Sequence, residues 1–376
     1  MSSCIGTKHL QENEKLLYRQ TLKYPKGFSP EGLTDLYVEK VNSRIRPTSL
    51  SLPVGMYYLG KKKFKKEKFV AKKEKVELKF DRKIARTKSE KKIANLQYRK
   101  QNAVDAITKK MDNGNLLMQW GEPIAVFDTA AIRQSKIKIE TFLFNKGYFD
   151  SKVESTYKDL RKKRVSVTYE IIPGKPFTFD TLFYNIHDSK VLSFILKNKA
   201  NSFIKKGEQY DQNNLGKERD RIDQLLKDNG YYDFSKQYVD FSIDTTTKKN
   251  KIKIQLEILN PSKRGYHKQF KVDSIIFTPD AAVLGQENKK RQSTSFHDIT
   301  FNSFENLYSK KILAQRVFIS KDSLYSRTKT FNTQRQLANL DNFKFVNLNY
   351  DTSGGKFIAN LFTSPLDRYT WEMKLV

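Results

Sequence analysis

The stretch from Gly55 to Lys62 comes nearest to a motif that does chemistry. It reads Gly-Met-Tyr-Tyr-Leu-Gly-Lys-Lys, which nearly matches the glycine-rich loop that cradles nucleotide phosphates. That loop needs a Ser or Thr hydroxyl for Mg²⁺ where this sequence has Lys62, and small residues where Tyr57 and Tyr58 stand. We therefore expect no nucleotide site here.

Residues suited to metal binding or acid–base catalysis are present but form no recognisable set. The four histidines stand far apart, without the spacing of metal ligands: His9, His187, His267 and His297. Three aspartates fall on one predicted helix: Asp220, Asp223 and Asp228. We expect them to balance four nearby cations: Lys217, Arg219, Arg221 and Lys227. No G-x-S-x-G, H-E-x-x-H or paired-carboxylate pattern occurs, so we expect no enzyme activity, no cofactor and no metal.

The chain carries a large excess of positive charge, and one segment holds much of it. Its 376 residues include 71 Lys and Arg against 41 Asp and Glu, a net charge of +30. Residues 61–110 contain 20 of these cations and 6 of the anions. The run from Lys61 to Lys66 also places Phe64 among lysines, a mixture that nucleic-acid-binding proteins use. Charge alone leaves the anionic partner open between nucleic acid, a membrane surface and an acidic protein.

Length and hydropathy indicate several folded domains. With 38% hydrophobic and 12% aromatic residues, the chain can build about two to four cores. No run approaches the roughly 18 consecutive apolar residues of a transmembrane helix. The single cysteine, Cys4, excludes an internal disulfide. Ser2 and Ser3 before it are typical of the end of a bacterial lipoprotein signal, and the alternative is an ordinary start with a free thiol.

A short pattern recurs along the chain and indicates repeated modules. Residues 143–150 read Leu-Phe-Asn-Lys-Gly-Tyr-Phe-Asp, and residues 226–233 read Leu-Lys-Asp-Asn-Gly-Tyr-Tyr-Asp. Residues 337–343 form a third, weaker copy. In each copy a leucine stands six residues before an aromatic residue: Leu143 and Phe149, Leu226 and Tyr232, Leu337 and Phe343.

The residues around the first copy predict its secondary structure. Apolar residues at helical spacing predict a helix that begins at Asp128-Thr129, and Gly147 supplies the left-handed stop. Residues 153–157 and 165–171 then alternate as half-buried strands do. Pro173-Gly174 ends the second strand.

The other units follow the same order. The second copy predicts a helix over 217–229 and strands over 239–243 and 252–258. The third predicts a strand over 270–277, helices near 305–319 and 325–341, and strands near 343–350 and 356–362. The first unit begins with a strand near 14–24 and a helix that Ser29-Pro30 opens and that carries Leu33, Leu36 and Tyr37.

An insertion between about residues 47 and 120 interrupts the first unit. Within it, apolar residues at helical spacing predict a basic amphipathic helix over 86–112: Ile93, Leu96, Val104, Ile107 and Met111. We expect this helix to be solvated and to pack on its own module. The alternative is a helix that binds a membrane surface or a partner.

We therefore predict an α+β fold of three tandem modules, each ordered strand, helix, helix, strand, strand. The predicted segments are a tether over 1–12, modules over 13–174, 175–263 and 264–366, and a final segment over 367–376. The strand that leaves one unit runs within a few residues into the next, so the modules should follow one another like beads on a string.

This pattern resembles the POTRA domains of the BamA/TamA superfamily of outer-membrane assembly factors. It is most similar to the TamA-like lipoproteins of Bacteroidetes, called TamL, over most of residues 10–365. Four motifs carry the resemblance: Gly121-Glu122-Pro123, Asn145-Lys146-Gly147-Tyr148-Phe149, Pro173-Gly174-Lys175-Pro176-Phe177 and Asn229-Gly230-Tyr231-Tyr232. The start Cys4-Ile5-Gly6-Thr7-Lys8 also resembles mature lipoproteins of this kind, which implies a lipid at Cys4.

Members of this family continue into a C-terminal membrane β-barrel. Residues 369–375 alternate between apolar and polar, as a first barrel strand would, and the alternative is a sheet-edge strand. We expect the chain to be the periplasmic arm of a longer protein, without its signal peptide and barrel. The resemblance implies a place at the periplasmic face of the bacterial outer membrane.

The resemblance also implies a function in outer-membrane protein assembly, by adding unfolded clients as strands to sheet edges. We expect these edges in the strands after the repeated glycine: Lys152, Val153, Glu154, Ser155, Thr156, Tyr157, Val239, Asp240, Phe241, Ser242 and Ile243. Expected partners are unfolded barrel clients, a TamB-like or other periplasmic protein, and the membrane through lipid and barrel. The alternatives are a spacer that binds little, and a basic soluble scaffold or nucleic-acid-binding protein, the weaker hypothesis.

Overall fold

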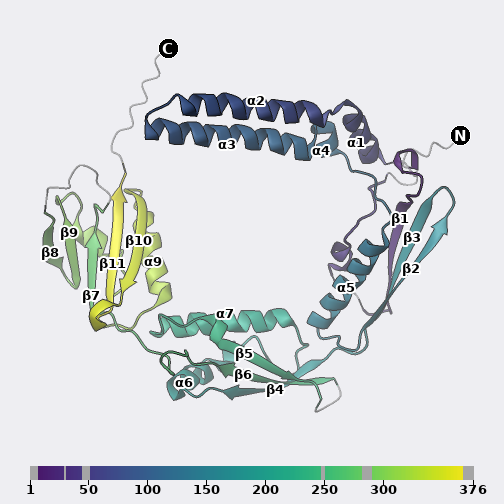
Figure 1. Cartoon of the computed structure of the whole chain (residues 1–376). Helices are drawn as coiled ribbons and strands as arrows, with labels where there is room; N and C mark the ends of the chain where they lie inside the picture. Colours follow the sequence, from purple (N-terminus) through teal and green to yellow (C-terminus); the bar gives the residue numbers. More distant parts are fainter. Residues whose placement is uncertain (1–6, 29–30, 45–50, 247–249, 282–289, 367–376) are drawn as a thin grey trace. The chain divides into compact units, whose positions relative to one another are not determined.

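The computed structural model describes residues 7–28, 31–44, 51–246, 250–281 and 290–366 (Figure 1). The chain forms two compact units. Unit 1 comprises Met1–Phe144 and Tyr148–Lys175, and unit 2 comprises Asn145–Gly147 and Pro176–Val376. The expectations for a lipid at Cys4 and for a barrel strand over 367–376 lie outside the described residues.

A three-stranded sheet and one long helix make the core of unit 1. The strands are β1 (Leu16–Lys23), β2 (Lys152–Leu160) and β3 (Arg164–Ile172), in the spatial order β1-β3-β2. β1 runs parallel and β2 antiparallel to β3. The alternation predicted over 165–171 is confirmed, because Val165, Val167 and Tyr169 are fully buried in a core shared with helix α5 (Thr129–Asn145). The residues between them face away from that core.

Four helices fill the predicted insertion: α1 (Leu52–Lys63), α2 (Lys66–Ala85), α3 (Glu90–Asn113) and α4 (Leu116–Trp120). α3 confirms the helix predicted over 86–112, whereas α2 was not predicted. α2 and α3 run side by side as a helical hairpin (Figure 1).

The near-match to a phosphate loop lies inside α1, so it forms no loop. Its second glycine has a packing role. A Cβ on Gly60 would lie 2.6 Å from the side-chain oxygen of Asn115 and 2.9 Å from the backbone nitrogen of Met118. The glycine therefore lets α4 pack closely on α1.

The prediction of a helix after Ser29-Pro30 is wrong. Ser29 and Pro30 lie outside the described residues, and the segment after them forms only the 3₁₀ turn η2 (Leu33–Leu36). Gly32 has a left-handed φ of 84° directly before this turn, and Tyr37 returns to extended backbone directly after it. The apolar residues that suggested a helix still pack on the core, but from one turn.

The first half of unit 2 repeats the arrangement of unit 1. Its strands are β4 (Thr178–Asn185), β5 (Val239–Asp244) and β6 (Lys251–Ile258), in the order β4-β6-β5, with β4 parallel and β5 antiparallel to β6. Helices α6 (Ser189–Lys197) and α7 (Gln212–Asp228) share its core. Two 3₁₀ turns, η3 (Lys199–Asn201) and η4 (Lys236–Tyr238), complete it. The predicted helix over 217–229 and both predicted strands are confirmed.

The second half of unit 2 keeps this plan and extends it. Its sheet has five strands in the order β10-β11-β7-β9-β8. The elements are β7 (Ser274–Thr278), β8 (Gln292–Phe296), β9 (Ile299–Ser303), α8 (Lys310–Ala314), α9 (Arg327–Ala338), β10 (Phe343–Asp351) and β11 (Ile358–Pro365). The prediction of the order strand, helix, helix, strand, strand is wrong for this module, because the β8–β9 hairpin follows its first strand. α8 also corrects the helix expected near 305–319, because only five residues are helical there.

The repeated leucines explain the sequence repeat. Leu143, Leu226 and Leu337 are each 0% exposed, and each fixes the last turn of its helix to its own core. Together with the shared strand order, this confirms the predicted α+β fold of tandem modules. The third module departs from the other two by its added hairpin.

Candidate functional site

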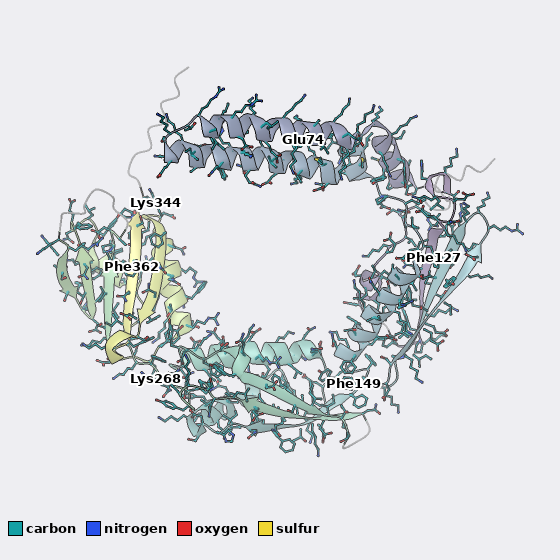
Figure 2. All side chains as sticks on the ribbon, viewed as in Figure 1. Glu74, Phe127, Phe149, Lys268, Lys344 and Phe362 are labelled. Carbon is teal, nitrogen blue, oxygen red and sulfur yellow. The ribbon has the colours of Figure 1, made fainter. Side chains whose placement is uncertain are left out.

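Strand β2, which holds six of the predicted edge residues, lies at the edge of its sheet. Among the described residues it pairs with β3 alone, in unbroken antiparallel register over all nine residues. Val153 is buried, whereas Tyr157 is 57% exposed and rests its ring 5.0 Å from that of Phe127 (Figure 2). β2 therefore presents a row of backbone N–H and C=O groups along its outer side.

Strand β5, which holds the predicted residues Val239 to Ile243, is also an edge strand. It pairs with β6 over six residues, so it is shorter than β2. Arg219 of α7 covers part of it, because its Nε donates a hydrogen bond to the Val239 carbonyl at 2.9 Å. The same guanidinium lies 5.0 Å from the centre of the Phe241 ring. β2 is thus the longer of the two edges, and the start of β5 is already bonded.

The opposite edges of these two sheets are partly closed. The chain before α5 pairs with the start of β1, where the Phe127 N–H donates to the Lys15 carbonyl at 2.8 Å. The chain before α7 likewise pairs with the start of β4, where the Phe179 N–H donates a hydrogen bond to the Glu208 carbonyl at 2.9 Å. In the third sheet, β9 pairs with β7 on the corresponding side.

A shallow groove of about 420 Å³ runs across the first sheet and reaches β2. Its lining includes Tyr18 and Arg19 from β1, Ser166 from β3, and Thr156 and Lys158 from β2. Two cations and several hydroxyls therefore line it, without a carboxylate. Such a polar surface beside an open edge suits the side chains of an added strand.

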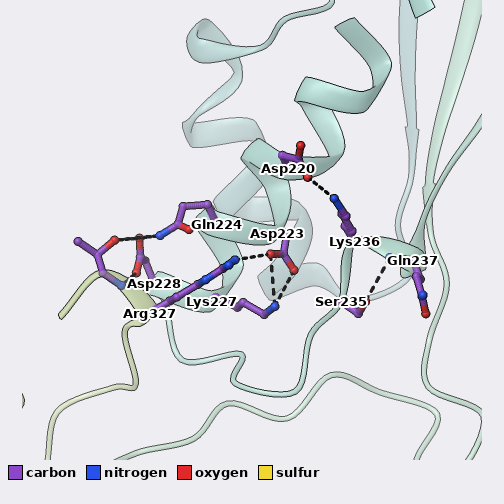
Figure 3. A network of polar contacts seen from close by, with 10 residues as sticks. Asp220, Asp223, Gln224, Lys227, Asp228, Ser235, Lys236, Gln237 and Arg327 are labelled. Carbon is purple, nitrogen blue, oxygen red and sulfur yellow. Dashed lines mark hydrogen bonds and ion pairs between the residues drawn. The ribbon is translucent and has the colours of Figure 1, made fainter. Parts of the chain in front are cut away.

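The three aspartates of the second module form ion pairs and a helix cap (Figure 3). Asp220 pairs with Lys236 at 2.8 Å, and Asp223 pairs with Lys227 at 3.0 Å and with Arg327 at 2.9 Å. Only one of the four cations expected to balance them, Lys227, does so. The other partners come from η4 and α9, which helical spacing alone cannot reveal.

Asp228 binds the first turn of α9. Its carboxylate accepts hydrogen bonds from the Thr328 N–H, the Thr328 hydroxyl, the Ser326 hydroxyl and the Gln224 amide, each at 2.8 Å. Burial alone would raise the pKa of Asp228, but these hydrogen bonds outweigh burial and lower it. The carboxylate is therefore a structural anion that joins the second module to the third.

The repeated glycine joins modules within unit 2. The Gly230 carbonyl accepts a hydrogen bond from the Phe270 N–H at 2.8 Å, and the Tyr325 N–H donates to the Phe270 carbonyl at 3.0 Å. Tyr232, two residues after this glycine, places its ring 5.0 Å from that of Tyr325 and 5.1 Å from that of Phe357. It thereby packs on the core of the third sheet.

The first copy of the motif makes the same bonds. The Gly147 carbonyl accepts from the Phe177 N–H at 2.9 Å, and the Tyr210 N–H donates to the Phe177 carbonyl at 2.8 Å. Gly147 has a φ of 83°, and a Cβ there would lie 2.9 Å from the Tyr210 carbonyl oxygen. The motif that revealed the repeat therefore makes the same backbone hydrogen bonds in both copies, to a phenylalanine that precedes the next strand.

His267 is buried, its Nε2 lies 3.1 Å from the Leu259 carbonyl, and burial lowers its pKa. No group of three or more metal-ligating side chains occurs in the described part of the chain. None of the described helices has both the length and the apolar composition needed to cross a bilayer.

Comparisons with known proteins find one family and several solved structures. Residues 86–174 match the family model described as POTRA, surface antigen variable number repeat. A search of curated proteins found no match.

The solved structures are similar only at low scores. POTRA3-5 of BamA from Haemophilus influenzae has a TM-score of 0.33 and 12% identity, and the match covers 65% of this chain and 86% of that one. POTRA1-3 of Omp85 from Anabaena has a TM-score of 0.23 and 13% identity, over 66% of this chain and 85% of that one. These scores are too low to assign a function.

Proposed function

We propose, from the premise that residues 86–174 are a POTRA domain, that this chain is the periplasmic arm of an outer-membrane protein assembly factor. In this proposal it receives unfolded clients as an added strand on β2. The single observation that carries the proposal is the open edge of β2, in the module that the POTRA match covers.

Strand addition suits a factor with many clients. The bonds are made by the main chain, so they tolerate different client sequences, whereas side chains beside the edge supply limited selectivity. β2 offers nine residues, close to the roughly 9–11 residues of a membrane β-strand. The groove next to it carries Arg19 and Lys158, which would favour clients with acidic residues.

The finer parts of the proposal concern residues and partners beyond the described chain. Lipidation at Cys4 would hold the arm at the periplasmic face of the outer membrane. A C-terminal barrel would follow the last module, and a TamB-like protein would be one periplasmic partner. Mass spectrometry of the protein purified from its own membranes tests the lipid directly, because a thioether-linked diacylglycerol adds a defined mass to the peptide that begins at Cys4.

The test of strand addition uses adjacent proline substitutions. In an antiparallel edge strand, backbone N–H groups point alternately to the neighbouring strand and to the free edge. Of Ser155→Pro and Thr156→Pro, one therefore breaks a bond to β3 and the other removes only an outward donor. Thermal unfolding identifies the variant that stays folded, and Ser155→Val and Thr156→Val serve as controls that keep the N–H.

The readout is crosslinking to a client. A photoreactive phenylalanine analogue replaces Tyr157, and the probe is an eight-stranded outer-membrane barrel protein diluted from urea. We expect the folded proline variant to crosslink about tenfold less than its valine control, because it loses a hydrogen bond and adds a ring at the edge. Equal crosslinking of the two would overturn strand addition at β2. The pair Phe241→Pro and Ser242→Pro tests strand addition at β5 in the same way.

A further inference from the structure

The helical hairpin of unit 1 has one apolar seam, and that seam is already filled. On α2, the half-buried residues include Phe69, Val76 and Phe80, spaced by seven and four positions. On α3, Ile107 is only 7% exposed, and Asp81 of α2 binds Lys100 of α3 at 2.6 Å across the pair. The apolar side of α3 therefore packs on α2, so the hairpin cannot use that side to enter a membrane.

One flank of α2, beside the seam, carries a continuous row of cations. Six exposed cations follow one another at alternating spacings of four and three residues: Lys68, Lys72, Lys75, Lys79 and Arg82 of α2, and Arg86 directly after its end. This spacing keeps them on one side of a helix, over a length of ~27 Å at 1.5 Å per residue. None of the six has an ion-pair partner within the described residues. We call this row the basic flank.

Three of the four acidic residues of α2 lie on the other flank, and the fourth, Glu77, is half-buried. Glu67, Glu74 and Asp81 follow one another at intervals of seven residues, a spacing that places them on one side of the helix, away from the basic flank. A solvated helix gains stability when opposite charges stand four residues apart. Here Lys68 and Lys72, Lys75 and Lys79, and Arg82 and Arg86 place like charges at that spacing instead. The arrangement costs helix stability, and an anionic ligand would offset the repulsion.

An exposed leucine on the basic flank indicates the kind of ligand. Lys75, Lys79 and Arg82 surround Leu78 in a hollow of about 290 Å³, and Leu78 is 57% exposed. Cations around an apolar side chain match the phosphate and the upper acyl region of an anionic phospholipid. The aromatic residues of α2, Phe69 and Phe80, lie at the seam, so the flank offers no ring for stacking bases.

We propose that the basic flank of α2 binds the surface of a membrane that contains anionic phospholipid, with the helix lying along the surface and Leu78 entering the headgroup region. This binding does not depend on the proposed function of the sheet edges. It needs only the charge pattern and the exposed leucine of one helix.

The experiment measures sedimentation of the full chain with two kinds of vesicle: phosphatidylcholine alone, and phosphatidylcholine with phosphatidylglycerol. The test variant changes Lys72, Lys75, Lys79 and Arg82 to Gln, which keeps a good helix former at each position. The matched control changes four exposed lysines of unit 2 to Gln and so alters the net charge equally: Lys190, Lys199, Lys205 and Lys206. Circular dichroism checks that both variants keep the helix content of the unmodified chain.

We expect the unmodified chain to bind the vesicles with phosphatidylglycerol and to leave those without it unbound. The flank variant should bind at least about tenfold more weakly, the control should stay within about twofold, and Leu78→Gln should weaken binding without changing its salt dependence. Equal losses in the flank variant and the control would overturn the proposal, because net charge alone would then explain binding. A lack of vesicle binding, or tighter flank-dependent binding to duplex DNA, would overturn it as well.

Discussion

Replacement of Asp228 by Ala should destabilise unit 2 far more than the loss of an exposed ion pair. The carboxylate accepts four hydrogen bonds, and one comes from Ser326, the residue that caps α9. Loss of a helix cap costs about 1 kcal/mol. Unpaired donors cost about 1–3 kcal/mol, and we take the lower end because solvent reaches part of the site. The free energy of unfolding should therefore fall by about 2 kcal/mol.

Hydrogen–deuterium exchange and urea unfolding measure this effect. Exchange at the first turn of α9 should speed up in Asp228→Ala, because the Thr328 N–H loses its acceptor. The control is Asp220→Ala, whose ion pair with Lys236 is 63% and 60% exposed and should contribute at most about 0.5 kcal/mol. If both variants lost the same stability, the capping role of Asp228 would be wrong.

The stability that the Asp228 carboxylate contributes should depend on pH. The hydrogen bonds hold the pKa of Asp228 below its ordinary value of 3.8, so its contribution is complete above that value and is lost as the pH falls through the lower, folded pKa. The difference in unfolding free energy between the unmodified chain and Asp228→Asn should therefore be constant from about pH 7 to 5 and shrink below about pH 4. A difference that grew in acid would contradict this assignment.

Three further substitutions test the packing. Gly147→Ala should lower the free energy of unfolding by about 2 kcal/mol, because φ is 83° and the new Cβ would meet the Tyr210 carbonyl. The control Gly207→Ala, with φ of 87° and open space around the new Cβ, should cost about half as much in the same thermal unfolding experiment. Leu337→Ala should cost about 2–5 kcal/mol in urea unfolding of unit 2, since the leucine is fully buried. Ile107→Lys should place a charge in the seam of the hairpin, so that circular dichroism loses helix and proteases cut between residues 66 and 113 while the sheets remain intact.

Local patterns were enough to predict the three strands that each of the sheets has in common. Strands β3 and β6 alternate strictly because one face meets helices and the other meets solvent, and the repeated leucines mark where each long helix ends on its core. The helix α2 was missed because its apolar residues stand among many cations, and because the helix packs against α3, which follows it in the chain. Its helical state depends on a partner that the local sequence does not display.

The sequence indicated which strands lie at the sheet edges, but it did not indicate how much of each edge is free to bind another strand. The order of strands within each module already places β2 and β5 at the edges. The bond from Arg219 to the Val239 carbonyl comes from a different element, so strand order cannot foresee it. The β8–β9 hairpin was missed for another reason, because Gln292–Phe296 is exposed and polar and lacks the alternation of a half-buried strand.

The joint at Gly230 has a consequence for cooperativity. The third sheet takes an aromatic ring, Tyr232, from the module before it, and α9 begins on a carboxylate of α7. The sequence repeat and the cooperative folding unit therefore have different boundaries, and a fragment cut at residue 264 should lose both contributions. Because synthesis proceeds from the N-terminus, α7 and Tyr232 are made before the sheet that they complete, so the second module can serve as a template for the start of the third.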